Sequence, residues 1–200
     1  MVVIAGPNGS GKTMLTRYLS DAGLHFPNYQ NTDDRAARRL LLREDRHDQT
    51  APPPSRTALM AARASFSYET VLASPTHVAK LRVARDLGYF VRLIYVATDD
   101  PDICVARVAD RVAKGGHNIA RDRILRNYRV SLDESLIAAV RLADECLIFD
   151  TSHGASGQPV RVAHIIGKYV RRWQNPALNW PETCLFDKLR ADEDFVFAPD

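Results

Sequence analysis

A short apolar run followed at once by a glycine-rich octapeptide constrains this chain more than any other feature. The run Val2–Ala5 is continuous and rich in β-branched residues, which predicts a buried strand that stops at Gly6-Pro7. The octapeptide fits the pattern GxxxxGK[ST] at every fixed position and consists of Gly6, Pro7, Asn8, Gly9, Ser10, Gly11, Lys12 and Thr13. A helix is expected from Lys12 to about Ala22, because Gly23 ends the helical pattern. This order of strand, loop and helix is the context that a phosphate-binding loop requires.

The octapeptide also has the residue types that phosphate binding needs. Its glycines let backbone N–H groups approach phosphate oxygens closely, and the start of the following helix adds positive potential. In this pattern Lys12 reaches the β- and γ-phosphates, and the Thr13 hydroxyl ligates Mg²⁺. We therefore expect a nucleoside triphosphate such as ATP, together with Mg²⁺, at this loop.

Apolar strands and amphipathic helices alternate along the rest of the chain. Further strands are expected at 29–32, 68–73, 90–97 and 146–149. Helices are expected between them, at 33–43, 57–64, 75–87, 101–113 and 120–143. Strands separated by helices imply βαβ crossovers. The predicted fold class is therefore α/β, with a mostly parallel five-stranded sheet and helices on both faces.

Length and charge indicate how the chain is organised. It has 200 residues, 46% of them hydrophobic, which is enough for one core. Residues 1–172 are assigned to a single domain that ends in a hairpin over 160–170. Residues 173–200 contain prolines, and the last twenty hold six acidic and two basic side chains. We expect them to form an irregular, acidic C-terminal tail.

Several classes of protein are disfavoured by the composition. Three cysteines with no CxxC pair argue against a disulfide framework or a zinc knuckle and favour a reducing cytoplasm. No apolar run approaches the roughly 18 residues of a membrane span, and the N-terminus has no signal-peptide pattern. A cytoplasmic protein with no membrane partner is expected.

Two carboxylates stand where chemistry is expected. Asp33, in the sequence Asn31-Thr32-Asp33-Asp34, follows the second predicted strand at the edge of the sheet where α/β ligands bind. It could accept a proton from a substrate hydroxyl or hold Mg²⁺ through water, although a helix N-cap explains it equally well. Glu69 lies inside an apolar strand, where a carboxylate is costly unless it is paired or faces a site. A substrate role is favoured over a structural ion pair.

The surplus of arginine is concentrated in one stretch. The formal charge is +3, but residues 107–129 hold seven basic and two acidic side chains. The stretch could be a solvated face of two helices, or a lid whose arginines neutralise a transferring phosphoryl group. Arg107 and Arg111 are four apart and share a helix face, and Gly115-Gly116 offers a hinge. A nucleic-acid groove ranks lower, because few aromatic residues are interleaved with the charge.

The ordered set of motifs resembles the zeta-toxin family of P-loop kinases over about residues 1–170. The matching features are the phosphate loop, Asn31-x-Asp33, Tyr68-Glu69-Thr70, Arg111-Val112-x-x-Gly115-Gly116-His117, Ile124-x-Arg126-x-Tyr128-x-x-Ser131-Leu132 and Phe149-Asp150. Members of this family are toxins of toxin–antitoxin pairs. They use ATP or GTP to phosphorylate the 3′-hydroxyl of the amino sugar in UDP-N-acetylglucosamine.

The resemblance implies a P-loop NTPase/kinase fold and a role for each matching residue. Asp33 would be the general base, and Lys12 and Thr13 would hold nucleotide and Mg²⁺. Asn31, Glu69 and Thr70 would line the sugar-nucleotide pocket, while Arg111 and Arg126 would contact the γ-phosphate. A protein antitoxin would be the partner of the chain.

Two positions depart from the family pattern, and two other functions stay open. Many relatives have Arg and Asn where this chain has Asn127 and Thr151. The first departure concerns the basic lid and the second the contact with the nucleotide base. The alternatives are a P-loop kinase for another hydroxyl (an antibiotic, a nucleoside or a polynucleotide end) and a nucleotide-gated binding protein without turnover.

Overall fold

The computed structural model describes residues 1–31, 54–152, 158–173 and 175–199. The helix expected at 33–43 lies outside these residues, as does Asp33. Among the described helices, none is long and apolar enough to cross a membrane.

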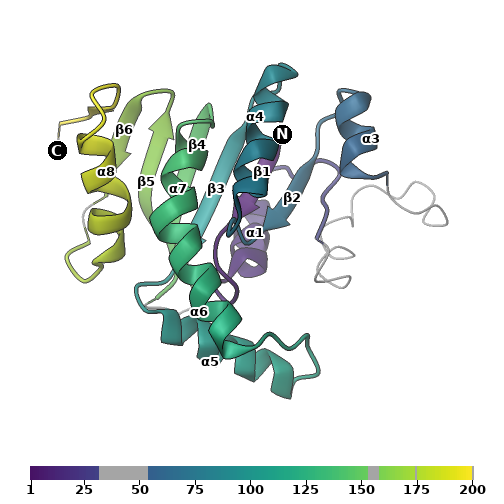
Figure 1. The fold of residues 1–200 in the computed structure, drawn as a ribbon, viewed down its shortest axis with the longest axis vertical. Coiled ribbons are helices and arrows are strands. Elements are labelled where there is room, and N and C mark those ends of the chain that lie inside the picture. Colours follow the sequence, from purple (N-terminus) through teal and green to yellow (C-terminus); the bar gives the residue numbers. More distant parts are fainter. Residues whose placement is uncertain (32–53, 153–157, 174, 200) are drawn as a thin grey trace.

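A central sheet of seven strands forms the middle layer of the molecule (Figure 1). Its order is β2-β1-β3-β4-β5-β6-β7. The strands are β1 (Val2–Ala5), β2 (Ser67–Thr70), β3 (Arg92–Ala97), β4 (Glu145–Asp150), β5 (Val160–Ile166), β6 (Tyr169–Arg172) and β7 (Val196–Phe197). The neighbours from β2 to β4 are parallel, the β5–β6 hairpin is antiparallel to β4 and within itself, and β7 is parallel to β6.

Helices cover both faces of the parallel part of the sheet, as predicted. The helices of the described residues are α1 (Lys12–Asp21), α3 (Arg56–Ala61), α4 (Pro75–Asp86), α5 (Pro101–Ala113), α6 (Arg121–Arg129), α7 (Leu136–Val140) and α8 (Asp187–Arg190), of which α8 lies beside the β5–β6 hairpin (Figure 1). Alternate residues of the strands point to opposite faces. Val3 and Leu93 therefore join the large core with α4 and α7, while Ile4 and Ile94 pack with Leu15 of α1.

The expectation of five strands was wrong, for two reasons. Of the strand predicted at 29–32, the described residues form only a single bridge between Gln30 and Tyr68, just after the backbone turns at Asn28, whose φ is 42°. The hairpin β5–β6 and the short β7 instead extend the sheet beyond β4. Sequence periodicity located the hairpin but did not indicate that its strands continue the sheet.

The helix predicted over 120–143 runs in one direction, but its hydrogen-bonding pattern changes along its length. A π-helical turn, Val130–Ser135, separates α6 from α7. Within this turn the Ser131 hydroxyl lies 2.9 Å from the Tyr95 hydroxyl, so two buried polar groups satisfy each other.

The expectation of an irregular segment after Trp173 was wrong. A π-helical turn, Pro181–Phe186, leads directly into α8, and β7 follows. Apolar side chains of this segment are buried in the large core, namely Leu178, Trp180, Leu185, Phe186, Leu189 and Phe195. The acidic side chains were a poor guide, because they occupy the outer side of elements whose inner side is apolar.

The same segment is held at the carboxyl ends of β3 and β4. The Trp180 indole Nε1 donates to Asp150 Oδ2 at 2.7 Å, and the Asn179 and Trp180 backbone N–H groups donate to Asp99 at 2.7 and 3.0 Å. The C-terminal segment therefore supports the strand ends beside the phosphate loop.

Candidate functional site

The octapeptide forms a tight loop between β1 and α1 that only glycine allows at two positions. Gly6 and Gly9 have φ of 148° and 81°. A Cβ on Gly6 would lie 2.0 Å from the Val96 carbonyl oxygen, and one on Gly9 would lie 2.4 Å from that of Cys104. The loop thus packs against the end of β3 and the first turn of α5, with no room for a side chain there.

Contacts from the loop's own lysine and from β4 hold the loop in shape. The Lys12 Nζ donates to the carbonyl oxygens of Gly6 and Pro7, both at 2.8 Å. The Thr151 hydroxyl, just after β4, donates to the Ser10 carbonyl oxygen at 2.9 Å. No side chain caps the start of α1, because its N-cap is Gly11. Its first N–H groups are thus oriented as in sites that bind phosphate.

Glu69 is the centre of a group of hydroxyl contacts that we call the Glu69 cluster: Thr13, Thr16, Tyr29, Asn31 and Glu69. The Thr13 hydroxyl donates to the carboxylate at 3.3 Å, the Thr16 hydroxyl at 3.4 Å, and the Tyr29 hydroxyl by a shorter bond. Asn31 Nδ2 donates to the hydroxyls of Thr13 at 3.5 Å and Tyr29 at 3.4 Å. Strand β2, helix α1 and the segment before residue 32 thus meet at one carboxylate.

The environment of Glu69 balances burial against favourable contacts. Burial raises the pKa of its carboxyl group above the ordinary value, while the charge of Lys12 and the hydrogen bonds from Tyr29, Thr13 and Thr16 oppose that rise. Burial and the negative charge of Glu69 raise the pKa of Tyr29, so its hydroxyl stays protonated and donates. The cluster is therefore sensitive to any charge bound at the loop.

A cleft of about 570 Å³ opens above the loop. The loop and the Glu69 cluster line one side of it, and α5 with the residues after it lines the other. The lining residues are Asn8, Gly9, Gly11, Lys12, Thr13, Met14, Asn31, Glu69, Arg107, Val108, Arg111, Lys114, Gly115, Gly116 and His117. Its size is within the usual range of small-ligand pockets.

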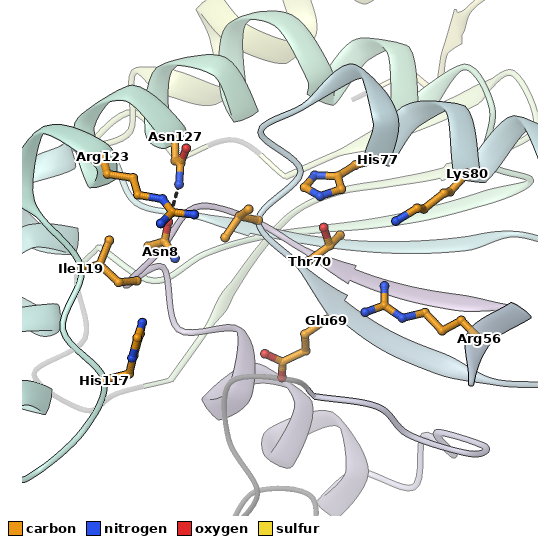
Figure 2. A pocket seen from close by; sticks show the side chains of 11 residues that line it. Asn8, Arg56, Glu69, Thr70, His77, Lys80, His117, Ile119, Arg123 and Asn127 are labelled. Atoms are coloured by element: carbon orange, nitrogen blue, oxygen red, sulfur yellow. Dashed lines mark hydrogen bonds between the residues drawn. The ribbon is translucent and has the colours of Figure 1, made fainter. Parts of the chain in front are cut away.

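A second cavity of about 290 Å³ adjoins the first and shares Asn8, Glu69 and His117 with it. Figure 2 shows the side chains around this cavity. Three cationic side chains come from three different helices: Arg56 from α3, Lys80 from α4 and Arg123 from α6. Thr70, His77 and Asn127 also line it.

Some basic residues of the stretch 107–129 line the cavities, as a role in phosphate binding would require, and others form a solvated helix face. Arg107, Arg111 and Lys114 line the first cleft, and Arg123 lines the second cavity. Arg121 and Arg129 instead pair with Asp102 and Glu134 on the surface, at 2.9 and 3.7 Å. One side of the stretch faces the cavities and the other is a solvated surface.

Most of the predicted site residues come together. Lys12, Thr13, Asn31 and Glu69 are linked around the loop, Thr70 lines the second cavity, and Arg111 lines the first, where its guanidinium donates to the His117 carbonyl oxygen at 3.0 Å. Arg126 is exposed on α6 and lines neither cavity. Its predicted role and that of Asp33 stay predictions.

Both departures from the family pattern contact the loop. Asn127 Nδ2 donates to Asn8 Oδ1 at 2.8 Å in a buried pair that joins α6 to the loop. Thr151 also accepts from Arg107, whose guanidinium donates to the Thr151 hydroxyl at 3.0 Å and to its carbonyl oxygen at 2.6 Å. The two residues thus connect the basic helices to the loop.

Sequence reasoning missed Tyr29, Arg56, His77 and Lys80. Tyr29 is 40 residues from Glu69 in the sequence, and no local pattern links the two. Arg56, His77 and Lys80 come from α3 and α4, whose positions relative to β2 follow from tertiary packing. Each of them is, in sequence, an ordinary polar residue of an amphipathic helix.

The oxygen atoms at the loop fit Mg²⁺. This ion prefers oxygen and is usually bound through few protein groups, phosphate oxygens and water. The Thr13 hydroxyl and the Glu69 carboxylate lie 3.3 Å apart beside the loop. Among the described residues, no group of three or more His, Cys, Asp or Glu could hold a metal by itself. Thr13 would hold Mg²⁺ together with nucleotide phosphates.

The chain was compared with protein-family models, with curated proteins and with solved structures. No protein-family model matches the chain. Over 63 residues the chain is 32% identical to an uncharacterized protein of Haemophilus influenzae. The aligned segment makes up 32% of this chain and 45% of that protein. The native AvrRxo1-ORF1:-ORF2 complex matches with a TM-score of 0.55 and 15% identity over 100% of this chain and 71% of the matched chain. The same complex with ATP matches with a TM-score of 0.51 and 15% identity over 83% of this chain and 58% of that one.

These likenesses establish the fold. That fold is a seven-stranded α/β sheet in which β1 leads through the glycine-rich loop into α1. The chain spans less than half of the Haemophilus influenzae protein and less than two thirds of the AvrRxo1 chain with ATP.

Proposed function

We propose that this protein is an ATP-dependent kinase that transfers the γ-phosphoryl group to a hydroxyl of a small acceptor. The observation that carries this proposal is the pair of adjoining cavities, which meet at Asn8, Glu69 and His117. In-line phosphoryl transfer needs a donor site and an acceptor site that share one boundary, because the reaction is catalysed mainly by positioning and charge stabilisation. The first cleft is the donor site, and the second cavity is the acceptor site.

The proposed tasks fall to the phosphate loop and to residues that the family resemblance names. The loop N–H groups and Lys12 bind the phosphates of ATP or GTP, and Arg111 neutralises charge on the transferring group. Asp33 is the general base that accepts the hydroxyl proton. Mg²⁺, held by Thr13, would act as a Lewis acid and neutralise phosphate charge.

The acceptor we propose is the amino-sugar hydroxyl of a UDP-activated sugar, of the UDP-N-acetylglucosamine type. The zeta-toxin motifs support this choice, and so does the position of Thr70 and Glu69 on the acceptor cavity. The same resemblance supports a toxin that a protein antitoxin neutralises. Both AvrRxo1 structures are complexes of ORF1 with ORF2, and one of the two structures contains ATP. These neighbours support the proposal that this chain binds a protein partner and a nucleotide.

A product assay tests the reaction. Purified protein is incubated with ATP, Mg²⁺ and a panel of UDP-sugars, and products are identified by mass spectrometry. We expect one phosphorylated sugar nucleotide, and none with Lys12→Ala protein. The absence of such a product above the Lys12→Ala control would refute the UDP-sugar acceptor, and a product from a cell extract would then identify another hydroxyl.

Growth of an expressing host tests toxicity and the base together. Expression of the protein alone is expected to stop bacterial growth, and Asp33→Asn should relieve this at equal protein level. Equal toxicity of the Asp33→Asn form would argue against Asp33 as the base.

A further inference from the structure

The face of the sheet that carries α1 is left open to solvent beyond β4. In the β5–β6 hairpin, Ile165 and Val170 are buried in the large core, and their strand neighbours point to the other face. On that face Ile166 stands opposite Tyr169, and Tyr169 stands opposite Val196 of β7. These three side chains are 55%, 72% and 53% exposed, in that order. They form one apolar row that the described residues leave uncovered.

Two arginines lie beside this row, and an aromatic ring fixes their guanidinium planes. Arg171 and Trp173 follow Tyr169 at intervals of two residues, and the Trp173 N–H still bonds to β5, so the three side chains share a face. The Cζ atoms of Arg171 and Arg161 lie 5.1 and 5.4 Å from the centre of the Trp173 ring. Among the described residues, neither arginine forms an ion pair with a carboxylate. The two positive charges are held in place and are not neutralised.

The carboxylate that β4 places on this face is already paired. Glu145 stands opposite Ile166 and contacts Arg92 Nε at 2.6 Å and His164 Nε2 at 2.9 Å. The charge that the face leaves uncompensated is therefore positive. A complementary ligand is anionic and offers flat or apolar groups to the exposed row.

We propose that this surface, which we call the open face, binds single-stranded nucleic acid through Arg161, Ile166, Tyr169, Arg171, Trp173 and Val196. Single strands bind where cations meet their phosphates and where their unpaired bases can stack, on aromatic rings or on guanidinium planes. Side chains on one face of β6 repeat about every 7 Å, so the Tyr169 ring and the Arg171–Trp173 stack offer two successive stacking positions. A bare ring and fixed guanidinium planes favour this ligand over an acidic peptide, whose carboxylates require only charge.

The open face is separate from the proposed kinase site. None of its six residues lines the donor cleft or the acceptor cavity. The basic stretch 107–129 has few aromatic side chains between its charges, whereas aromatic and cationic residues alternate on one strand in Tyr169, Arg171 and Trp173. Nucleic-acid binding at the open face therefore does not depend on phosphoryl transfer, and the two proposals can fail independently.

Fluorescence anisotropy with labelled oligonucleotides tests the open face. The probes are oligothymidylate and oligouridylate, each of about 15 nucleotides, which is within the site sizes of known single-strand binders. We expect a Kd of about 1–100 µM at physiological salt, as for other sequence-independent binding. Tighter binding of one probe would identify the sugar that the face prefers, and equal binding would show that it accepts both. Polyglutamate, which carries charge but no bases, should not displace either probe.

Substitutions on the open face separate stacking from charge. Tyr169→Leu should weaken binding by about fivefold or more, and Tyr169→Phe should not, because phenylalanine keeps the flat ring. Arg171→Gln should reduce the slope of log K against log salt by about 0.7, the contribution of one phosphate contact on a single strand. Arg82→Gln is the matched control. Arg82 is exposed on α4, which packs on the opposite face of the sheet, so its loss should change neither quantity.

Several results would overturn the proposal. They are the absence of binding at millimolar protein, displacement of the probes by polyglutamate at equal charge, and equal affinities of the Tyr169→Leu and Tyr169→Phe proteins. Binding that falls with Arg123→Gln but not with Arg171→Gln would also overturn it, because the strand would then lie at the acceptor cavity. Circular dichroism checks that each variant, altered only at an exposed position, is folded.

Discussion

Glu69 is bound by hydroxyl groups where an ordinary buried carboxylate would have an arginine. Three hydroxyls donate to it, and the nearest cation that affects its pKa is Lys12, which is itself bonded to the loop carbonyls. A buried carboxylate without a dedicated cation costs stability, and such costs are common at functional sites. The arrangement leaves Glu69 able to respond to what binds on either side of it.

Replacing Glu69 by glutamine should stabilise the protein in a pH-dependent way. Burial raises the pKa of Glu69 above its unfolded value, so ionisation disfavours the folded state as the pH rises from the unfolded pKa through the folded one. Glutamine does not ionise. The difference in free energy of unfolding between Glu69→Gln and the unchanged protein should therefore grow over this pH window, by about 1.4 kcal/mol for each unit of pKa shift.

Urea unfolding from pH 4 to pH 8 measures this difference. A difference that stays constant over the range would contradict the assignment. Phosphoryl transfer should fall in the same variant, because the carboxylate at the boundary of the two cavities is lost.

Gly9→Ala tests the packing of the loop against α5. The new Cβ would meet the Cys104 carbonyl oxygen at 2.4 Å, in addition to the strain of a left-handed φ. Gly23→Ala is the control, because Gly23 has φ of 92° and open space around its Cα. The control should cost about 1–2 kcal/mol from strain alone. Gly9→Ala should cost more and also abolish ATP binding, as measured by urea unfolding and calorimetry; equal costs would show that the clash is relieved.

At the residue scale, the sequence predicted the loop side of the site better than the acceptor side. The spacing of Lys12 and Thr13 is a local property, and Glu69 stood out as a carboxylate in an apolar strand. Arg123 and Arg126 are one helical turn apart, and charge alone did not tell which one reaches the cavity. Tyr29 carries no local signal, because its partner is brought to it by the pairing of Gln30 with β2.

At the scale of elements, α5 and α6 are tied to the phosphate loop by polar contacts as well as by apolar packing. Arg107 of α5 binds Thr151, which binds the loop, and Asn127 of α6 binds Asn8 within it. A small apolar cluster of Cys104, Val108 and Ile124 holds the two helices to each other. These contacts fix the position of both helices relative to the loop.

Asn127→Ala should separate these effects. It leaves the buried Asn8 side chain without its donor, which costs about 1–3 kcal/mol in the free energy of unfolding. ATP affinity should fall with it, because Asn8 lines the donor cleft. Asn118→Ala, at an exposed position between α5 and α6, is the control in thermal unfolding and ATP titration. Unchanged stability of Asn127→Ala would mean that the Asn8 contact is replaced by water.

The helix from 121 to 140 marks a limit of sequence prediction at this scale. Its apolar stripe located the element correctly, but periodicity cannot show the π-helical turn at Val130–Ser135. Such a turn holds one more residue than an α-helical turn, so the side chains of α7 face a different direction from the one that the periodicity of α6 would give. Within the turn, Ser131 hydrogen-bonds Tyr95, which comes from a strand more than thirty residues earlier.

At the scale of the whole molecule, the C-terminal segment completes the core. Its buried side chains lie over the hairpin and the end of the sheet, and Trp180 stacks at a tilt on Tyr95, with ring centroids 6.2 Å apart. Composition suggested a tail because acidic side chains are numerous there. The apolar residues that hold this segment in the core lie between the acidic ones, so the net charge of the segment does not reveal them.

Leu185→Ala should therefore destabilise the entire protein. Leu185 is fully buried, and loss of such a side chain costs about 2–5 kcal/mol, a large share of a typical stability. Glu193→Ala, on the surface of the same segment, should have almost no effect. Thermal unfolding followed by circular dichroism measures both, and a wild-type midpoint for Leu185→Ala would mean that the segment folds independently.

The contact between Trp180 and Asp150 has a consequence for the protein's synthesis. Every described residue that lines the two cavities precedes position 128 in the chain, whereas the indole that supports the end of β4 beside the loop comes much later. On the ribosome, the residues that line the two cavities are made while their support is still missing. A nascent chain can close its core only after the segment around Trp180 has left the exit tunnel. A chain truncated before Trp180 should therefore lack a stable core, and its loop would have no support at the end of β4.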